Sequence, residues 1–131
     1  MKKNDYSQLA NEEETMKLYH VIFHLDEDSE QKANEVFNNL RNLLADLGEE
    51  NVEVELLTNG KGVMSMRKDN ESHGLRIRHL AKQGVKFLVC ANSLKHLGIP
   101  TDELAPDAEI VPAGVSELVK KQIEGWAYIR P

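Results

Sequence analysis

Hydrophobic positions along the chain change their spacing several times, and each change predicts a new element. Apolar runs rich in β-branched residues occupy 18–25, 52–60, 85–90 and 108–114. Short runs of this composition, followed by acidic, Asn-Gly or Pro and Gly positions, are typical of strands. The last residues, "WAYIRP", predict a short fifth strand.

Between these runs the apolar positions lie three or four residues apart, which is typical of helices that pack against a sheet. The clearest helix is predicted over 28–48. Asp28 and Gln31 resemble an N-terminal capping box, and Gly48 suits the end of the helix.

Three further helices are predicted in the second half of the chain. The first covers about 73–83, after a less regular stretch from 61 to 72, and the second covers 91–98 with Asn92 or Ser93 as its cap. The third covers 115–126, and we expect its inner face to hold Val115, Leu118, Val119 and Gln122.

Strands and helices therefore alternate from 18 onward. Because a parallel connection between strands needs a crossover, this order predicts parallel pairing with helices on both faces. We expect an α/β protein with a three-layer α/β/α architecture and a mostly parallel sheet of about five strands. One domain would span 17–131, preceded by a polar N-terminal tail over 1–16.

Composition narrows the possible partners. The chain has 131 residues and a net charge of −6, which argues against general nucleic-acid binding because phosphate contacts need a basic surface. No apolar run reaches membrane-spanning length, and the N-terminal lysines are not followed by the apolar core of a secretory signal. A single cysteine forms no internal disulfide, so we expect a reducing, cytoplasmic setting.

The ends of the predicted strands indicate where a site would lie, because ligands of open α/β sheets bind beyond the carboxyl ends of the strands. These ends carry His24 with Asp26, Asn59 with Gly60, Cys90, and the segment 112–114. The loop "LDEDSE" is too acidic for a flavodoxin-like phosphate site, and neither a Walker loop nor a dinucleotide fingerprint is present.

Cys90 allows two interpretations. A thiol just ahead of a helix meets unpaired backbone N–H groups, which favour the nucleophilic thiolate, and Lys95 and His96 would add positive charge. Free cysteine is also a common small filler of protein cores, and spacing alone favours that structural role.

Other polar features favour ordinary structural roles. His20 and His24 share a strand face, but no second pair at metal-ligand spacing accompanies them, so we expect hydrogen-bonded histidines and no metal site. The segment 67–82 holds five Lys or Arg against two acids and is either an anion site or, more commonly, a solvated helix face. Trp126 and Tyr128 are more typical of packing or of an interface than of a binding cage.

Five quoted pieces of the chain resemble the DsrE/DsrF-like family of the YchN-like fold, in its small stand-alone, single-domain branch. These pieces are "VIFHLDE", "NNLRNLL", "LLTNG", "GVKFLVCANSL" and "VPAGVSELVKKQIEGWAYIRP". The resemblance covers about 17–131 and implies a layered α/β/α domain that assembles as a homo-oligomer, a trimer or a hexamer. It also implies a link to sulfur metabolism, since better-known relatives pass sulfur as a cysteine persulfide.

The resemblance also suggests site residues. The motif cysteine of the branch matches Cys90, its polar loop positions match Asn59, Gly60, Asn92 and Ser93, and His24 matches the residue that ends the first strand. The chain departs from the relay proteins in the local sequence around the cysteine, so sulfur transfer rests on analogy of fold and cysteine.

Two functional hypotheses follow. In the first, Cys90 is the catalytic residue of a sulfurtransferase-like persulfide carrier that needs no cofactor and works with a sulfur donor and an acceptor protein. In the second, the chain is a non-enzymatic ligand-binding or scaffold homo-oligomer in which Cys90 is inert.

Overall fold

A computed structural model describes residues 17–131, so the predicted polar tail over 1–16 lies outside the described residues. Five strands form one sheet in the order β4-β3-β2-β1-β5. All four neighbouring pairs are parallel, which confirms the expected α/β class and its parallel sheet. The strands are β1 (Tyr19–Leu25), β2 (Val52–Thr58), β3 (Lys86–Cys90), β4 (Ala108–Val111) and β5 (Ala127–Ile129).

The strand order places the start of the domain inside the sheet. From β1 the chain adds β2, β3 and β4 outward on one side, and it then returns to pair β5 with the opposite side of β1. Because every strand runs in the same direction, all five carboxyl ends lie at one edge. Only β4 and β5 are edge strands, and both are short.

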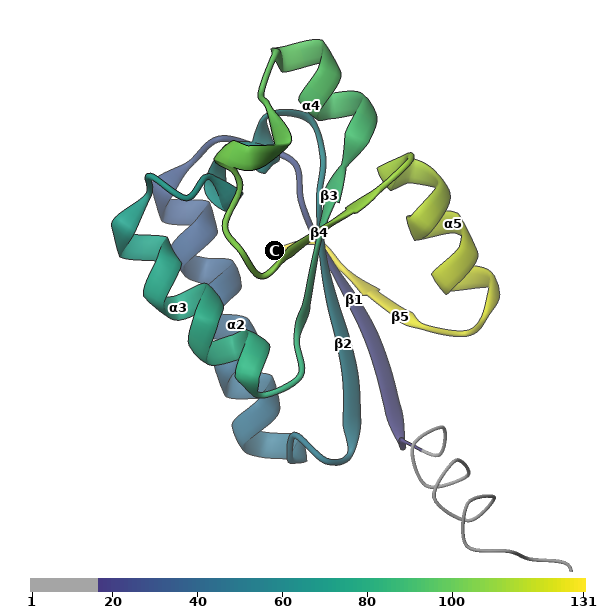
Figure 1. Ribbon diagram of the computed structural model, residues 1–131. Helices are drawn as coiled ribbons and strands as arrows, with labels where there is room; N and C mark the ends of the chain where they lie inside the picture. Colours follow the sequence, from purple (N-terminus) through teal and green to yellow (C-terminus); the bar gives the residue numbers. More distant parts are fainter. Residues whose placement is uncertain (1–16) are drawn as a thin grey trace, which may run out of the picture.

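Helices cover the two faces unequally (Figure 1). The long helices α2 (Glu30–Leu47) and α3 (Glu71–Lys82) lie on one face, and α5 (Gly114–Ile123) lies on the other. The short helix α4 (Ala91–Leu97) follows β3 directly at the carboxyl edge. Two 3-10 segments, η1 (Gly60–Met66) and η2 (Thr101–Glu103), complete this edge. The expected three-layer α/β/α architecture is therefore confirmed.

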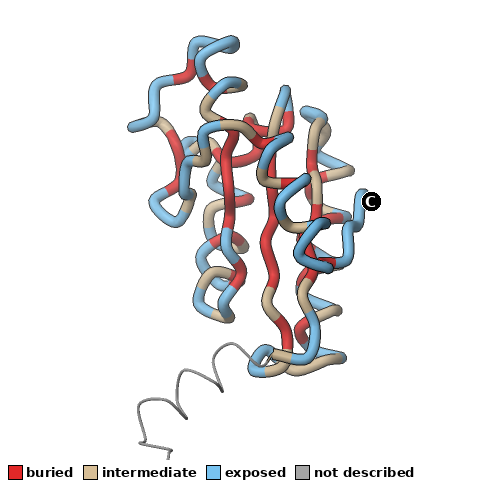
Figure 2. Tube along the Cα trace, turned by 90° about the vertical axis from the view of Figure 1, so that its right-hand side faces the viewer, coloured by how far each residue is buried: buried red, intermediate tan, exposed pale blue. Residues whose placement is uncertain are grey.

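Two hydrophobic cores follow from this arrangement. The larger core lies under α2 and α3 and contains the fully buried rings of Phe23, Phe37 and Phe87. The smaller core lies under α5 and consists of five buried residues, Ile22, Leu57, Leu88, Leu118 and Trp126. Figure 2 shows buried positions running along the central strands, flanked by exposed helix surfaces. The α5 layer is thus held by much less apolar contact than the opposite layer.

The structure corrects several local expectations about helix starts. The first helix is capped by Ser29, whose hydroxyl accepts the Lys32 N–H at 3.1 Å, and Asp28 is not the cap. Ser29 has extended backbone angles and lies three residues before Lys32, which is the geometry a cap requires. Gly48 ends this helix with a positive φ of 90°, as expected.

The cap of α4 is also different from the prediction. Neither Asn92 nor Ser93 is the cap, because β3 continues into α4 without a loop and Cys90 occupies that position. The irregular stretch after β2 contains η1, and α3 starts earlier than expected, at Glu71 after the Asn70 cap.

The expected inner face of the last helix is wrong for most of its residues. Of Val115, Leu118, Val119 and Gln122, only Leu118 is buried, while Val115 and Val119 are 64% and 54% exposed. A single helix on this face touches the sheet along a narrow line, so the rest of its apolar stripe points outward. Trp126 is buried in the smaller core, which agrees with the packing role expected for it.

Candidate functional site

Three segments meet at the carboxyl edge of the sheet. A Cβ atom placed on Gly114, the first residue of α5, would lie 3.2 Å from the Cβ atoms of both Asn59 and Cys90. It would also lie 3.3 Å from Cδ2 of Leu57. The ends of β2 and β3 and the start of α5 are therefore in direct contact, and glycine is the residue that permits it.

Cys90 ends β3 beneath this contact. It lies two residues after Leu88, so both side chains point to the α5 face of the sheet. The residue is only 5% exposed. A reagent therefore has little access to this side chain in the conformation described.

Opposing effects act on the Cys90 thiol. Burial raises the pKa of this thiol, whereas hydrogen bonding by the Ser93 hydroxyl and by the backbone N–H groups of Gly114, Ser93 and Asn92 lowers it. The lowering effects prevail, and the net pKa lies below the ordinary value. Cys90 makes no side-chain hydrogen bond that caps α4, so these groups lie near the sulfur and lower its pKa by stabilising the negatively charged thiolate form.

Ser93 connects the thiol to the loop after β2. Its Oγ accepts the Gly60 N–H at 2.8 Å, which leaves the hydroxyl proton free to point at Cys90. A hydroxyl oxygen accepts one bond while its proton makes another, so the Gly60 contact orients this donor.

A second hydrogen-bonded chain runs along the same edge. His24 Nε2 lies 2.8 Å from Asn59 Oδ1, and His24 Nδ1 lies 2.7 Å from the Tyr128 hydroxyl. Because an amide oxygen only accepts, the Asn59 contact assigns the ring proton to Nε2, and in the neutral ring Nδ1 then accepts from Tyr128. The three strands β1, β2 and β5 are thereby linked next to Gly114.

The structure thus brings Cys90, Ser93, Gly60, Asn59 and His24 to one edge. The backbone N–H of Asn92 faces the sulfur, while its side chain lines a neighbouring hollow of about 300 Å³. That hollow is lined by Gly60, Lys61, Asn92, Ser93, His96 and Leu97. Asp26, which follows β1, instead forms an ion pair at 3.1 Å with Arg130, which follows β5.

Two contacts of the site were not predicted from the sequence, although the segment 112–114 was expected at this edge. The backbone N–H of Gly114 reaches Cys90 because the α5 start packs on β3, and no residue type signals a backbone donor. Tyr128 meets His24 because β5 pairs with β1, and strand order is not readable from residue periodicity.

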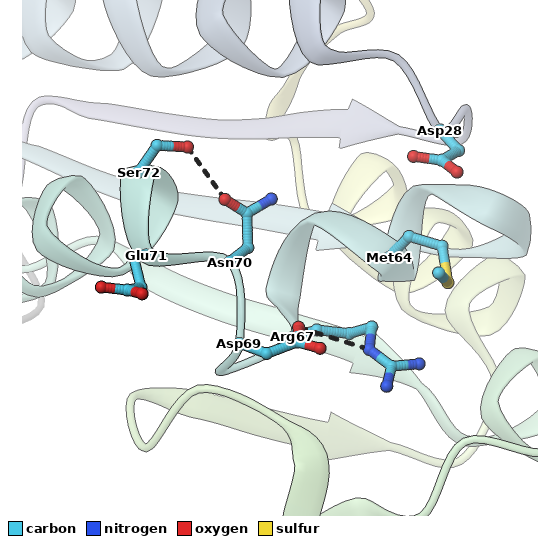
Figure 3. A pocket seen from close by; sticks show the side chains of 7 residues that line it. All are labelled: Asp28, Met64, Arg67, Asp69, Asn70, Glu71 and Ser72. Atoms are coloured by element: carbon cyan, nitrogen blue, oxygen red, sulfur yellow. Dashed lines mark hydrogen bonds and ion pairs between the residues drawn. The ribbon is translucent and has the colours of Figure 1, made fainter.

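A separate polar hollow of about 580 Å³ lies on the α2 and α3 side (Figure 3). Arg67 and Asp69 form an ion pair across it at 3.6 Å, and Asn70 accepts the Ser72 hydroxyl. Its lining residues are Asp28, Met64, Arg67, Asp69, Asn70, Glu71 and Ser72, and none of them is among the residues grouped around Cys90 above. Within 17–131 no group of His, Cys, Asp or Glu side chains is arranged to hold a metal ion.

None of the helices formed by the described residues is both long and apolar enough to cross a membrane.

Comparison with known proteins agrees with this architecture. The protein of unknown function MTH1491 from Methanobacterium thermoautotrophicum has a TM-score of 0.81 and 41% identity, covering 86% of this chain and 99% of that one. The ychN protein from E. coli has a TM-score of 0.70 at 17% identity over 86% of this chain and 99% of its own. BT1422 from Bacteroides thetaiotaomicron, a conserved protein of unknown function, has a TM-score of 0.64 at 13% identity, covering 98% of this chain and 100% of that one.

No curated protein matches the chain. A family model does match, over residues 16–131, which includes the whole of the described structure. Together with the parallel five-stranded sheet of the YchN-like fold, this match shows that the chain belongs to the DsrE/DsrF-like family.

Proposed function

We propose that this protein carries sulfane sulfur as a persulfide on Cys90 and acts as a sulfurtransferase-like relay. The observation that carries the proposal is the thiol at the sheet edge whose pKa is lowered, against burial, by hydrogen bonds from Ser93 and from three backbone N–H groups. Membership of the DsrE/DsrF-like family, which is broadly associated with sulfur relay, supports the same function.

The proposed loading step is a nucleophilic displacement. The Cys90 thiolate attacks the sulfane sulfur of a donor, a new S–S bond forms, and the bond from that sulfur to the donor breaks. The electron pair leaves with the donor, so no external oxidant is required.

Unloading repeats the same chemistry in the opposite sense. An acceptor thiolate attacks the outer sulfur, and Cys90 leaves as a thiolate. A leaving group with a lower pKa departs faster, so the donors around Cys90 assist both steps.

The remaining edge residues have supporting roles in this proposal. Gly60 orients the Ser93 hydroxyl, Asn92 contributes its backbone N–H, and His24 holds the Asn59 amide through Nε2. We infer that these residues position the thiolate and the incoming sulfur. The chemistry involves no cofactor, and the sulfur donor and acceptor are other proteins of the same cytoplasmic compartment.

We further infer that the protein works as a homo-oligomer, a trimer or a hexamer. The outer stripe of α5 supports this, because Val115, Val119 and Ile123 are 64%, 54% and 82% exposed. These residues are four apart and so form one continuous apolar line along the helix. Tyr128 and Ile129 on the edge strand β5 add further exposed apolar surface.

One observation favours a second candidate function. Cys90 is 5% exposed, which suits an inert packing residue in a non-enzymatic ligand-binding or scaffold oligomer. The two candidates differ in whether the native thiol reacts.

The test combines native alkylation with sulfur loading. We expect iodoacetamide to modify Cys90 of the folded protein, and a sulfane-sulfur donor to add one sulfur mass per chain. Cys90→Ser should abolish both changes while it leaves the circular dichroism spectrum unchanged. A thiol that stays unmodified until denaturant is added would instead support the scaffold candidate.

A further inference from the structure

A carboxyl group is buried beneath α5, on the same face of the sheet as Cys90. Glu55 lies in β2 and is 4% exposed. Its Oε1 atom is buried without any hydrogen-bond partner among the described residues. A buried carboxylate oxygen with no donor is unfavourable, whereas a carboxyl group that carries a proton can donate from that atom.

The groups next to Glu55 come mainly from α5. Lys121 Nζ lies 3.6 Å from Glu55 Oε2, and it is shared with Glu117 at 4.0 Å and Glu124 at 3.7 Å. The same ammonium group lies 4.6 Å from the centre of the Trp126 ring. One lysine therefore serves three carboxylates, and it cannot neutralise both Glu55 and Glu117.

Charged groups on the neighbouring strands lie further out on this face. Lys86 of β3 is the register partner of Glu55 and is exposed. Glu53 lies two residues before Glu55 on β2, and its Oε1 atom is 3.5 Å from Nε2 of His20 on β1. The charged and titratable groups that face Glu55 are therefore Glu117, Lys121 and Glu124 of α5, Lys86 of β3, His20 of β1 and Glu53 of β2.

The first turn of α5 joins this carboxyl pair to the thiol. Gly114 begins the helix and directs its backbone N–H at Cys90, and Glu117 follows one turn later beside Glu55. Leu57, two residues beyond Glu55 on the same strand, packs under Gly114. A movement of this turn would therefore change the exposure of the Cys90 side chain.

We propose that the Glu55–Glu117 pair is a proton-dependent latch that holds the first turn of α5 over Cys90, and that loss of the shared proton uncovers the thiol. The link to sulfur loading rests on the function proposed above.

In the closed state of this proposal, the proton lies on the otherwise unpartnered Oε1 atom of Glu55, and its bond to the neighbouring Glu117 carboxylate ties α5 to β2. When the proton leaves, two carboxylates face each other with a single shared lysine, and the buried one requires water. Burial first, and then the hydrogen bond and negative charge of Glu117, raise the pKa of Glu55 to about 7, although Lys121 lowers it. The change therefore falls in the neutral range.

The α5 layer is suited to such a movement. Only Gly114 and Leu118 of this helix are buried, and the smaller core beneath it contains five residues. Elements with few buried apolar contacts open at lower free energy than the main core.

The test measures the native alkylation rate of Cys90 with iodoacetamide from about pH 5 to about pH 9, divided by the thiolate fraction obtained from ultraviolet absorbance. In the wild-type protein we expect this normalised rate to rise about fivefold with a midpoint near pH 7. A rise of this size corresponds to the loss of one hydrogen bond, the bond between Glu55 and Glu117. Glu55→Gln keeps an uncharged donor toward Glu117, so its normalised rate should stay low and flat.

Glu53→Gln is the matched control, because Glu53 lies on the same face two residues away and is exposed at its side chain. We expect it to retain the wild-type rise. Should Glu55→Gln fold poorly, Glu117→Gln removes the other partner and should likewise abolish the midpoint near pH 7.

A wild-type normalised rate that does not change with pH would overturn the latch, as would a wild-type-like rise in a folded Glu55→Gln protein. Alkylation does not involve sulfur transfer, so the two proposals fail separately. A pH-dependent rate with no persulfide formed would contradict the relay alone, and persulfide loading with a flat rate would contradict the latch alone.

Discussion

The Cys90 site depends on a few polar contacts that surround one buried sulfur atom. Burial by itself would keep this thiol protonated, and the donors from Ser93, Gly114 and Asn92 reverse that tendency. Of these donors, only the Ser93 hydroxyl is a side chain, and its orientation is set by the Gly60 N–H. Ser93 is therefore the position at which a single substitution tests the electrostatics of the site.

Ser93→Ala should raise the pKa of Cys90, because the thiolate loses one hydrogen bond. We expect native alkylation at neutral pH to slow roughly three- to tenfold, the usual effect of one such bond. Thiolate absorbance measured against pH shows whether the pKa of Cys90 has risen. Ser116→Ala, an exposed serine in the first turn of α5, should leave the titration unchanged. An unaltered titration in Ser93→Ala would mean that backbone donors alone act on the thiol.

Among the elements, α5 is the one that connects the site to the rest of the sheet. Its start packs against β2 and β3 without room for a side chain at Gly114, and its second turn places Lys121 between acidic groups. The position of α5 is therefore sensitive to an added methyl group at Gly114 and to the charges around Lys121.

Gly114→Ala should disturb this packing. The added methyl group would lie 3.2 Å from two Cβ atoms, which is tighter than ordinary contact, so α5 must shift. We expect a loss of about 1 to 2 kcal/mol in unfolding free energy, measured by denaturant titration. The matched control is Gly74→Ala in α3, where nothing lies within 4 Å. That variant should gain about 0.5 to 1 kcal/mol, and a neutral Gly114→Ala would contradict the close packing.

The pKa of Glu55 predicts how stability depends on pH. Its value in the folded protein is about 7 against an ordinary 4.5, so the native state binds the proton more tightly than the unfolded chain. Stability from this group is fully present below about pH 4.5 and is lost as the pH rises through about 7.

Between these two pH values the free energy of unfolding should fall by on the order of 3 kcal/mol. Glu55→Gln should remove this part of the pH dependence of stability. Denaturant titrations at the two ends of this range measure it. A wild-type stability that increases from the acidic to the neutral end by a similar amount would contradict the assignment.

Glu55 also illustrates what the chain pattern could and could not predict. The alternation "VEVELLT" predicted a strand, and β2 spans Val52–Thr58. The pattern did not show that α5 would bury Glu55, because that depends on where a helix from the far end of the chain crosses the sheet. Periodicity is a local property, whereas strand order and helix placement arise from tertiary packing.

The whole molecule has one well-packed layer and one sparsely packed layer. The outer stripe of α5 and the edge strand β5 leave apolar side chains exposed, whereas the large rings are buried under α2 and α3. A second subunit against α5 would cover this stripe and would also influence the latch.

We therefore predict a mass well above 14.8 kDa in light scattering at micromolar concentration. Val119→Glu combined with Ile123→Glu places charges on the outer stripe and should reduce the measured mass to that of one chain. Leu75→Glu, at an exposed leucine of α3 on the opposite layer, should leave the assembly intact. A wild-type protein that scatters as a single chain would contradict the oligomer.

At the scale of the domain, the sequence was informative about the site as well as the fold. The rule that ligands bind at the carboxyl ends of strands placed His24, Asn59 and Cys90 at one edge, and the structure brings them there. The burial of Cys90 agrees with the core-filling role that its spacing favoured, whereas the contact between His24 and Tyr128 could not be predicted, since it depends on β5 returning to this edge. The catalytic role of Cys90 stays a prediction.

The most direct test of that role follows one sulfur atom through a full cycle. Native protein is loaded with a sulfane-sulfur donor, freed of excess donor, and then given an acceptor thiol, with the intact mass recorded after each step. We predict a gain of one sulfur mass per chain that is retained on removal of the donor and lost to the acceptor, with no gain in Cys90→Ser. A native chain that never gains the sulfur, or gains it equally without Cys90, would contradict the relay role of Cys90.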